Sequence, residues 1–471
     1  MWGHPRGLFV LFFAEMWERF SFYGMKTLLV LYMVKALLYE DHFASGVFGA
    51  YGGFAYAIPL IGGMLADRFL GYRRAIVTGG VLMAIGHFCM AVRNEYFFYG
   101  ALALIATGNG FFKPNISTLV GKLYAADDPR RDGAFTIFYM GINLGALLAT
   151  FICGLVGEKI GWHYGFALAG VGMIAGLTVF VRGGRHLGEQ GFPPRPEALG
   201  QKLVGGLSKL QGLYAGIVVA LPLIAMVMAQ PRWVQRGTTV VAVLALAYIV
   251  FEMIRSNDQE RGRIFVLLVL MFFSVVFWSC FEQAGSSITL FTDRLVDRRF
   301  LAWTIPTTQF LNLNPLFIFL LGLPFSAMWT WLARKNLNPS APVKFSLGLF
   351  QLSAGFLAMI FAASQAQRAG LANPGWIVLA YVLHTTGELC LSPVGLSTIT
   401  KFAPARIGGL LMGMWFLSTA LAEVLAGWIA GETGGGEYLR VFTHIVYFGA
   451  GSGVLLLLFS PVLKKLSYGV K

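Results

Sequence analysis

The sequence is poor in charge and in cysteine. Only 12% of its 471 residues are charged, and 22 of them are acidic. An ordinary soluble domain holds ~25% charged residues, so that class is excluded. The cysteines lie inside apolar stretches and lack the spacing of a metal site or of a disulfide framework, so we expect them to act as small packing residues. They are Cys89, Cys153, Cys280 and Cys390.

Signatures of enzymes and of targeting are missing as well. No phosphate-binding GxxxxGK[ST] loop occurs, and no Cys–His or Ser–His–Asp grouping has a plausible arrangement. The first apolar stretch is too long and too charged for a cleaved signal peptide. We therefore expect neither an enzyme nor an ATP-driven pump.

Long apolar stretches make up most of the chain, which is 57% hydrophobic. Each runs about 20 residues or more, the length of one helical crossing of a ~30 Å hydrocarbon core. We predict spans near 8–36, 43–66, 75–93, 96–120, 133–157, 162–182, 212–230, 236–254, 264–290, 312–333, 343–364, 375–400, 407–430 and 441–463. The pattern predicts an all-α polytopic membrane protein with 14 transmembrane helices.

Basic residues gather in alternate loops between these stretches, which accounts for the net charge of +14 without nucleic acid. Because cytoplasmic loops are the basic ones, we expect both termini in the cytoplasm. Two groups of six spans flank a polar linker, which fits the parallel-repeat plan of major facilitator transporters. We expect a first six-helix bundle at 1–182, a linker with two extra helices at 183–258 and a second bundle at 259–471. We expect the extra helices to pack laterally without a role in transport.

Glycines have two roles in this plan. The loop Gly62–Arg74 resembles the loop signature of the major facilitator superfamily, where glycines allow a tight turn and Asp and Arg side chains can pair across helix ends. The alternative is a generic basic loop. Inside the apolar stretches, glycines at four-residue spacing let helix backbones approach closely. They are Gly141, Gly145, Gly172 and Gly176.

Ionisable side chains interrupt the first apolar stretch. Six polar or aromatic residues follow offsets of 0, 3, 4, 7, 8 and 11, which trace one helix face: Glu15, Glu18, Arg19, Phe22, Tyr23 and Lys26. Lys113, Glu282 and Glu388 stand in three later stretches. Charges are expensive in a bilayer and usually face a polar pathway, so they predict a transporter. The alternative is a cluster that snorkels at a helix end.

Four segments carry a family resemblance: Glu15–Gly24, Phe111–Ser117, Phe277–Gln283 and Gly387–Ser397. They resemble, in the right order and over nearly the whole chain, the signatures of the proton-dependent oligopeptide transporter family. The sequence departs from that family at Phe22, where a Tyr is usual, so one hydroxyl is lost. Its second span has no histidine, so the proton site is sought among carboxylates.

The resemblance implies roles for individual residues. Arg19, Lys26 and Lys113 match a basic patch near the peptide carboxylate, and Glu388 matches the residue that faces the peptide amino group. Other matches to residues that line the substrate pocket are Tyr23, Tyr56, Asn143, Asn314, Trp415 and Ser418. Residues implied in proton coupling are Glu15, Glu18, Glu282 and Arg19.

Depth along the spans adds a pairing. Counting ~1.5 Å per residue places Lys26 and Glu282 at similar depth, which allows a gating salt bridge. The four acids exceed the three bases by one charge, which one proton would balance. His384 stands one turn from Glu388 and shares its helix face, although a lone membrane histidine is more often a packing residue. Glu423 receives no role.

These features together predict a proton-coupled symporter that imports di- and tripeptides across the inner (plasma) membrane by alternating access. We expect no cofactor other than the coupling proton, no nucleic acid, and a protein that works as a monomer. The alternatives are a transporter of the same family for nitrate, a drug or an amino-acid conjugate, and a drug/proton antiporter.

Overall fold

The structure is a computed structural model of the chain. It describes all residues except 1–3, 93, 126–127, 129, 203–205, 405–407 and 468–471. The start of the predicted first bundle and the end of the predicted second bundle therefore lie outside the described residues. Within the described part, fourteen long helices occur. They are α1 (Arg6–Lys35), α2 (Asp41–Leu65), α3 (Tyr72–Met90), α4 (Glu95–Lys122), α5 (Arg131–Lys159), α6 (Trp162–Gly183), α8 (Lys209–Met228), α9 (Pro231–Ile254), α10 (Asp258–Phe281), α12 (Leu313–Arg334), α13 (Ala341–Ala369), α14 (Pro374–Phe402), α15 (Gly408–Gly431) and α16 (Tyr438–Leu466).

Short elements join the long helices. They are η1 (Ala66–Leu70), η2 (Gly184–Leu187), α7 (Pro196–Gly200), η3 (Glu282–Gly285), α11 (Ser287–Leu295), η4 (Thr307–Asn312) and η5 (Gly434–Gly436). Strands β1 (Arg299–Phe300) and β2 (Trp303–Thr304) form an antiparallel hairpin after α11. All 14 predicted spans are present.

Apolar composition explains why these segments are helices of membrane length. Among the described residues, ten helices are long and apolar enough to cross a membrane. Helix α1 is not one of the ten, although its 30 residues are enough for a crossing, because Glu15, Glu18, Arg19 and Lys26 lie along its middle. Among the described residues α3, α4 and α14 are also outside the ten, so α1 is one of four long helices that depart from the composition rule.

The prediction of one continuous helix at 264–290 is wrong, because the structure has a break within this span. Helix α10 ends at Phe281, η3 follows, and the backbone at Ser286 leaves the helical region (φ −130°, ψ −92°) before α11 begins. The Gln283 amide, which is buried, donates to the carbonyls of Ser279 and Ala426 at 3.0 Å each. These bonds satisfy carbonyl groups near the break. Because α10 ends at Phe281, Glu282 lies at a helix end.

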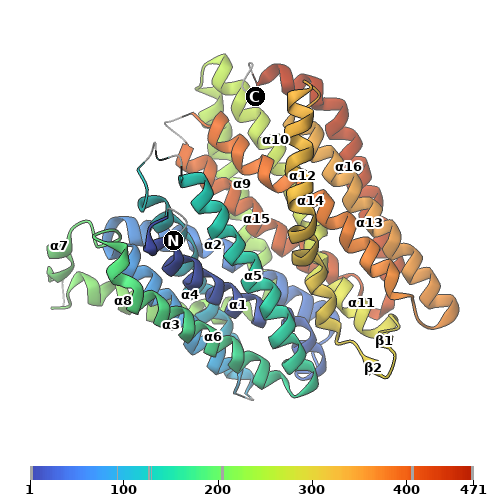
Figure 1. Cartoon of the computed structure of the whole chain (residues 1–471), viewed down its shortest axis with the longest axis horizontal. Helices are drawn as coiled ribbons and strands as arrows, with labels where there is room; N and C mark the ends of the chain where they lie inside the picture. The colour runs from blue at the N-terminus through green and yellow to red at the C-terminus, as the bar shows by residue number, and fades with distance from the viewer. Residues whose placement is uncertain are drawn as a thin grey trace. The chain divides into compact units, whose positions relative to one another are not determined.

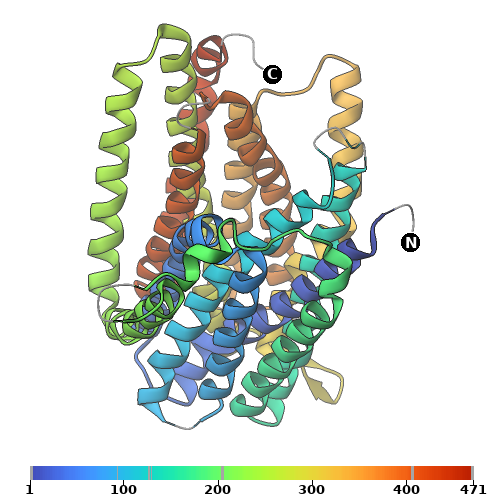
Figure 2. The same ribbon diagram turned by 90° about the vertical axis from the view of Figure 1, so that its left-hand side faces the viewer.

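The chain folds as two compact units. The first comprises residues 1–37 and 54–231, and the second comprises residues 38–53 and 232–471. In the first unit α1 packs on α5 and α6, α3 packs on α4, and α8 lies against α4. In the second, α13 packs on α14 and α16, and α10 packs on α15. Figure 1 shows α13 and α16 side by side. The buried residues of α9 are Val234 and Ile249, and Figure 2 shows this helix as an upright light-green ribbon.

Glycines set the helix spacing in the first unit. A Cβ at Gly145 of α5 would lie 2.2 Å from the Met16 carbonyl oxygen, and one at Gly172 of α6 would lie 2.4 Å from the Phe20 ring. Gly141 and Gly176 meet α1 in the same way. This confirms the prediction that the four glycines are packing positions.

The segment 38–53, which includes the first half of α2, packs inside the second unit. Asp41 receives two bonds from the Arg294 guanidinium, the longer of them 2.7 Å. A Cβ at Gly49 would lie 2.8 Å from the α-carbon of Gly427 on α15. Backbones in such close contact require glycine on both helices.

The glycine-rich loop after α2 uses its charges in an unexpected way. Asp67 accepts a hydrogen bond of 2.6 Å from the Tyr72 hydroxyl, and no arginine of the described residues pairs with it. Arg73 donates to the carbonyls of Gly188 and Gln190, and its guanidinium stacks on Phe192 at 4.3 Å. The loop therefore fastens the segment after α6 to the start of α3. The expected Asp–Arg pairing was wrong because backbone carbonyls lie closer to Arg73.

Candidate functional site

The charged face of α1 is buried in the first unit. The Arg19 guanidinium donates two hydrogen bonds to the Glu18 carboxylate, and its Nε lies 3.4 Å from Glu15 Oε1. Arg19 is 2% exposed, and both glutamates are fully buried. Snorkelling at a helix end is therefore excluded for these three residues. We call this group, together with Asn109, the α1 cluster.

Asn109 of α4 completes the α1 cluster and was missed by the sequence analysis. Its Oδ1 accepts from Arg19 Nη2 at 2.8 Å, and its Nδ2 donates to the Ala55 carbonyl at 3.0 Å. The signal in the sequence is spacing, because Asn109 stands one helical turn before Lys113. The amide holds the guanidinium in place and links α1 to α2 and α4.

Aromatic rings contact the cations of this unit. The Arg19 guanidinium lies 4.9 Å from the centre of the Phe22 ring and 6.0 Å from that of Tyr23. The Lys113 ammonium lies 4.8 Å from the centre of the Tyr56 ring. Rings attract cations through their faces, so Phe22 keeps this contact although it lacks the hydroxyl that is usual at its position.

The basic residues predicted to bind a carboxylate converge in the first unit. The charges of Glu15, Glu18, Arg19 and Lys26 all act on Lys113, which is half-buried. Asn143 of α5 donates to the Tyr139 carbonyl of its own helix at 3.0 Å. With every group ionised, Arg19, Lys26 and Lys113 together with Glu15 and Glu18 carry one net positive charge. Such a group can attract an anion.

The second unit contains a smaller group around Glu388, which lies on α14. Asn314 of α12 donates to Glu388 Oε2 at 2.9 Å and to the Thr385 hydroxyl at 3.1 Å. The charge of Glu282 acts on both Glu388 and Tyr381. We call Asn314, Thr385 and Glu388 the Glu388 cluster. It holds its carboxylate with neutral partners, so the carboxylate can accept a cation.

Sequence reasoning missed Thr385 and Tyr381. Thr385 precedes Glu388 by three residues and Tyr381 precedes it by seven, spacings that bring all three to one side of α14. His384, which the sequence places on the same helix face as Glu388, contacts a different helix. Its ring lies 4.8 Å from Phe356 and against Gly355 of α13, whereas Glu388 bonds to α12. The two side chains therefore have different surroundings.

The α15 residues Trp415 and Ser418 lie in the second unit too. The Trp415 indole rests on Gly395 of α14, where a Cβ would come within 2.4 Å of the ring. Ser418 donates to the Trp415 carbonyl at 2.7 Å. The serine hydroxyl thus uses its proton inside its own helix and can only accept from a ligand. Lys26 and Glu282 belong to different units, so their salt bridge stays a prediction.

Comparison with known proteins decides the family. The model of the POT family matches residues 73–436, which is more than half of the chain. The chain belongs to the POT family. A peptide transporter of Yersinia enterocolitica, YePEPT, is 38% identical, over 91% of this chain and 88% of that protein. Dipeptide and tripeptide permease B of Xenorhabdus bovienii is 33% identical, over 92% of this chain and 88% of that one.

Solved structures of POT transporters agree with the fold. A crystal structure of a mutant POT peptide transporter with alafosfalin has a TM-score of 0.85 and 34% identity, covering 99% of this chain and 96% of that one. A POT transporter with 5-aminolevulinic acid has a TM-score of 0.86 and 30% identity, covering 98% of each chain. The predicted major facilitator fold is confirmed, and the protein is a multi-span membrane transporter and not an enzyme.

Proposed function

We propose that this POT transporter is a proton-coupled symporter that imports di- and tripeptides by alternating access. Its location would be the inner (plasma) membrane, with both termini in the cytoplasm. A peptide is a zwitterion with a carboxylate at one end and an ammonium at the other. The first unit supplies three cations, and the second supplies Glu388 on neutral partners. Each end of the substrate thus has a partner of opposite charge.

The buried α1 cluster is the observation that carries proton coupling. Taking Glu18 and Arg19 out of water is expensive, and removing one partner of a buried ion pair costs ~3–5 kcal/mol. If Glu18 were neutralised, Arg19 would keep only the more distant Glu15 carboxylate, at 3.4 Å. A protonated glutamate therefore no longer neutralises its cationic partner, and a substrate carboxylate can take the place of the glutamate. Release of the proton on the inner side restores the ion pair and displaces the substrate. No other cofactor is required in this scheme.

The test is uptake into proteoliposomes with an imposed inward proton gradient. We expect di- and tripeptides to accumulate, and free amino acids and nitrate not to do so. Accumulation should require the gradient, because the proton supplies the driving force. That force is ~2.3 kcal/mol per charge per 100 mV, and each pH unit adds ~1.4 kcal/mol. Uptake that ignores the gradient would remove proton coupling from the proposal.

A second candidate keeps the charge logic but changes the substrate. The POT structure with 5-aminolevulinic acid shows that a relative accepts a small molecule with one amino group and one carboxylate. A compound of this class could use the same two charged ends. Accumulation of 5-aminolevulinic acid without that of dipeptides would favour this candidate. Accumulation of nitrate, which has no ammonium, would contradict both.

A further inference from the structure

A groove of about 830 Å³ opens where the end of α13 meets the start of α14, in the second unit. None of its lining residues belongs to the Glu388 cluster, and those on α14 precede Thr385 and Glu388 in the sequence. Its wall includes aromatic, aliphatic and amide side chains and one arginine, among them Phe361, Gln365, Arg368, Trp376 and Leu379.

The apolar wall of this groove is ordered and open. Phe361 stacks on Trp376 with ring centres 5.4 Å apart and planes at 28°. The indole Nε1 donates to Gln365 Oε1 at 3.0 Å, and the same oxygen accepts from the Asn373 backbone N–H at 3.0 Å. Phe361 is 56% exposed and Leu379 is 43% exposed. The rings are thus fixed in orientation while an apolar surface faces outward.

The groove also contains a cation without a protein partner. In the described part of the chain, Arg368 makes no hydrogen bond and no ion pair. The lining of the groove contains no aspartate and no glutamate. An exposed guanidinium beside a rigid aromatic wall is suited to an anionic group, which a guanidinium can hold with two hydrogen bonds.

The position of the groove along α13 matches a membrane boundary. From Lys344 to Arg368 the helix rises ~36 Å, slightly more than the ~30 Å of the hydrocarbon core. Arg368 therefore lies at the level of lipid headgroups when α13 crosses the membrane. Phe361 lies ~10 Å deeper, where acyl chains begin. Trp376 has the boundary position that tryptophan prefers.

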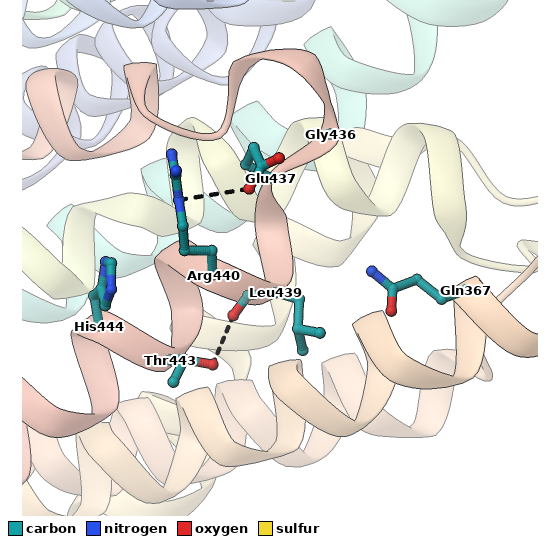
Figure 3. Close-up of a pocket in the computed structure, with 7 residues that line it drawn as sticks. All are labelled: Gln367, Gly436, Glu437, Leu439, Arg440, Thr443 and His444. Atoms are coloured by element: carbon teal, nitrogen blue, oxygen red, sulfur yellow. Dashed lines mark hydrogen bonds and ion pairs between the residues drawn. The ribbon is translucent and has the colours of Figure 1, made fainter.

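A neighbouring pocket provides a contrast. It has a volume of about 370 Å³ and lies between Gln367 of α13 and the start of α16, and Figure 3 shows its lining. Its arginine, Arg440, already has an acidic partner, with Nε 3.5 Å from Glu437 Oε2 (Figure 3). The two arginines can therefore be compared directly, because Arg440 has an acidic partner and Arg368 has none among the described residues.

We propose that the groove at Arg368 binds an anionic phospholipid. The headgroup phosphate is held by the Arg368 guanidinium, and one acyl chain lies over Phe361 and Leu379. The charge at one end of the groove and the apolar wall below it match the two parts of such a lipid. Binding here involves no residue of the candidate transport site.

The test is native mass spectrometry of the full chain with phosphatidylglycerol or phosphatidylcholine of identical acyl chains. We expect the wild-type protein to bind phosphatidylglycerol more tightly. Arg368→Gln should weaken that binding about fivefold, the factor that corresponds to ~1 kcal/mol per arginine at an anionic surface, and abolish the preference. Arg440→Gln is the matched control and should keep it.

Two further variants separate charge from folding. Arg368→Lys should retain most of the preference, because an ammonium still attracts the phosphate, and it shows that the position tolerates change. Phe361→Ala should weaken both lipids equally, because it removes contact with the acyl chain only. Equal losses in Arg368→Gln and Arg440→Gln, no preference in the wild type, or a protein dimer in place of a lipid adduct would each overturn the proposal.

Discussion

The two charged groups of this protein use opposite ways to hold ions in an apolar environment. The α1 cluster pairs Arg19 with two carboxylates and an amide, so its charges mostly satisfy one another. The Glu388 cluster supports one carboxylate by Asn314 beside Thr385, with no cation among those partners. The first group is stable until a proton disturbs it, whereas the second is ready for a cation. In the function that we propose, the first unit would respond to the proton and the second would recognise the substrate ammonium.

The largest effect is expected from Glu18→Gln. It removes one partner of the buried Arg19 ion pair, a change that costs ~3–5 kcal/mol in buried pairs. Proton-driven accumulation in proteoliposomes should be lost, while exchange of substrate across the membrane persists. Glu437→Gln, in an exposed pair with Arg440, is the control and should transport normally. Concentrative uptake by Glu18→Gln would remove Glu18 from the coupling step.

The next effect concerns the second group. Glu388→Gln removes the charge that we assign to the substrate ammonium, and a hydrogen bond to a charged group contributes ~1.5–3 kcal/mol. Peptide affinity should fall roughly 10- to 100-fold by that measure. Calorimetric titration with a dipeptide measures it. An N-acetylated dipeptide, which has no ammonium, should bind wild type and variant alike, and a loss for both ligands would point to damaged packing instead.

Lys113→Ala tests the carboxylate end in the same assay. The variant should bind dipeptides more weakly, because it removes one of three cations from the first unit. Lys122→Ala is the matched control, since it lies at the end of the same helix and stacks on Tyr72. If Lys113→Ala binds dipeptides as the wild type does, Lys113 is not part of the site.

A smaller effect is expected for the predicted salt bridge between Lys26 and Glu282. Lys26→Ala and Glu282→Ala should be non-additive in a double-mutant cycle on transport rate, with a coupling of ~0.5–3 kcal/mol if the residues pair. Additive losses mean that no salt bridge forms between them. Lys26→Ala with Glu437→Ala is the additive reference.

The smallest effect comes from an ion pair in water, which is the opposite extreme to Arg19 and Glu18. Asp297 accepts two hydrogen bonds from Arg299 at 2.9 and 3.0 Å, and these lower the pKa of its carboxyl to about 2. Since the unfolded pKa is about 3.9, the stabilisation is complete above that value and is lost as the pH falls toward 2. Comparing the melting temperatures of wild type and Asp297→Asn between pH 5 and pH 3 measures it. The difference in melting temperature should shrink as the pH falls. It should also be far smaller than the difference in melting temperature between wild type and Glu18→Gln.

The sequence was sufficient for the helices because most spans follow from length and apolar content, and the charged ones are still long enough to cross. It was insufficient at the α10 break, because a run of apolar residues does not reveal that Gln283 donates to one carbonyl of α10 and to one of α15. Spacing identified the stripe on α1, since its members share one face. The partners Asn109 and Thr385 were missed because a lone polar residue beside a charged one has no distinctive composition. The arginine of the loop signature was mispaired because its acceptors are backbone atoms, which every sequence contains.

The way in which residues 38–53 pack has a practical consequence. If the chain were cut after Pro231 and expressed as two pieces, the N-terminal piece would carry Asp41 and Gly49, whose partners Arg294 and Gly427 belong to the other piece. Neither fragment would be a finished folding unit. We expect the two fragments to be unstable when produced singly and to reconstitute a transporter when co-expressed, with Gly49→Leu preventing the reconstitution.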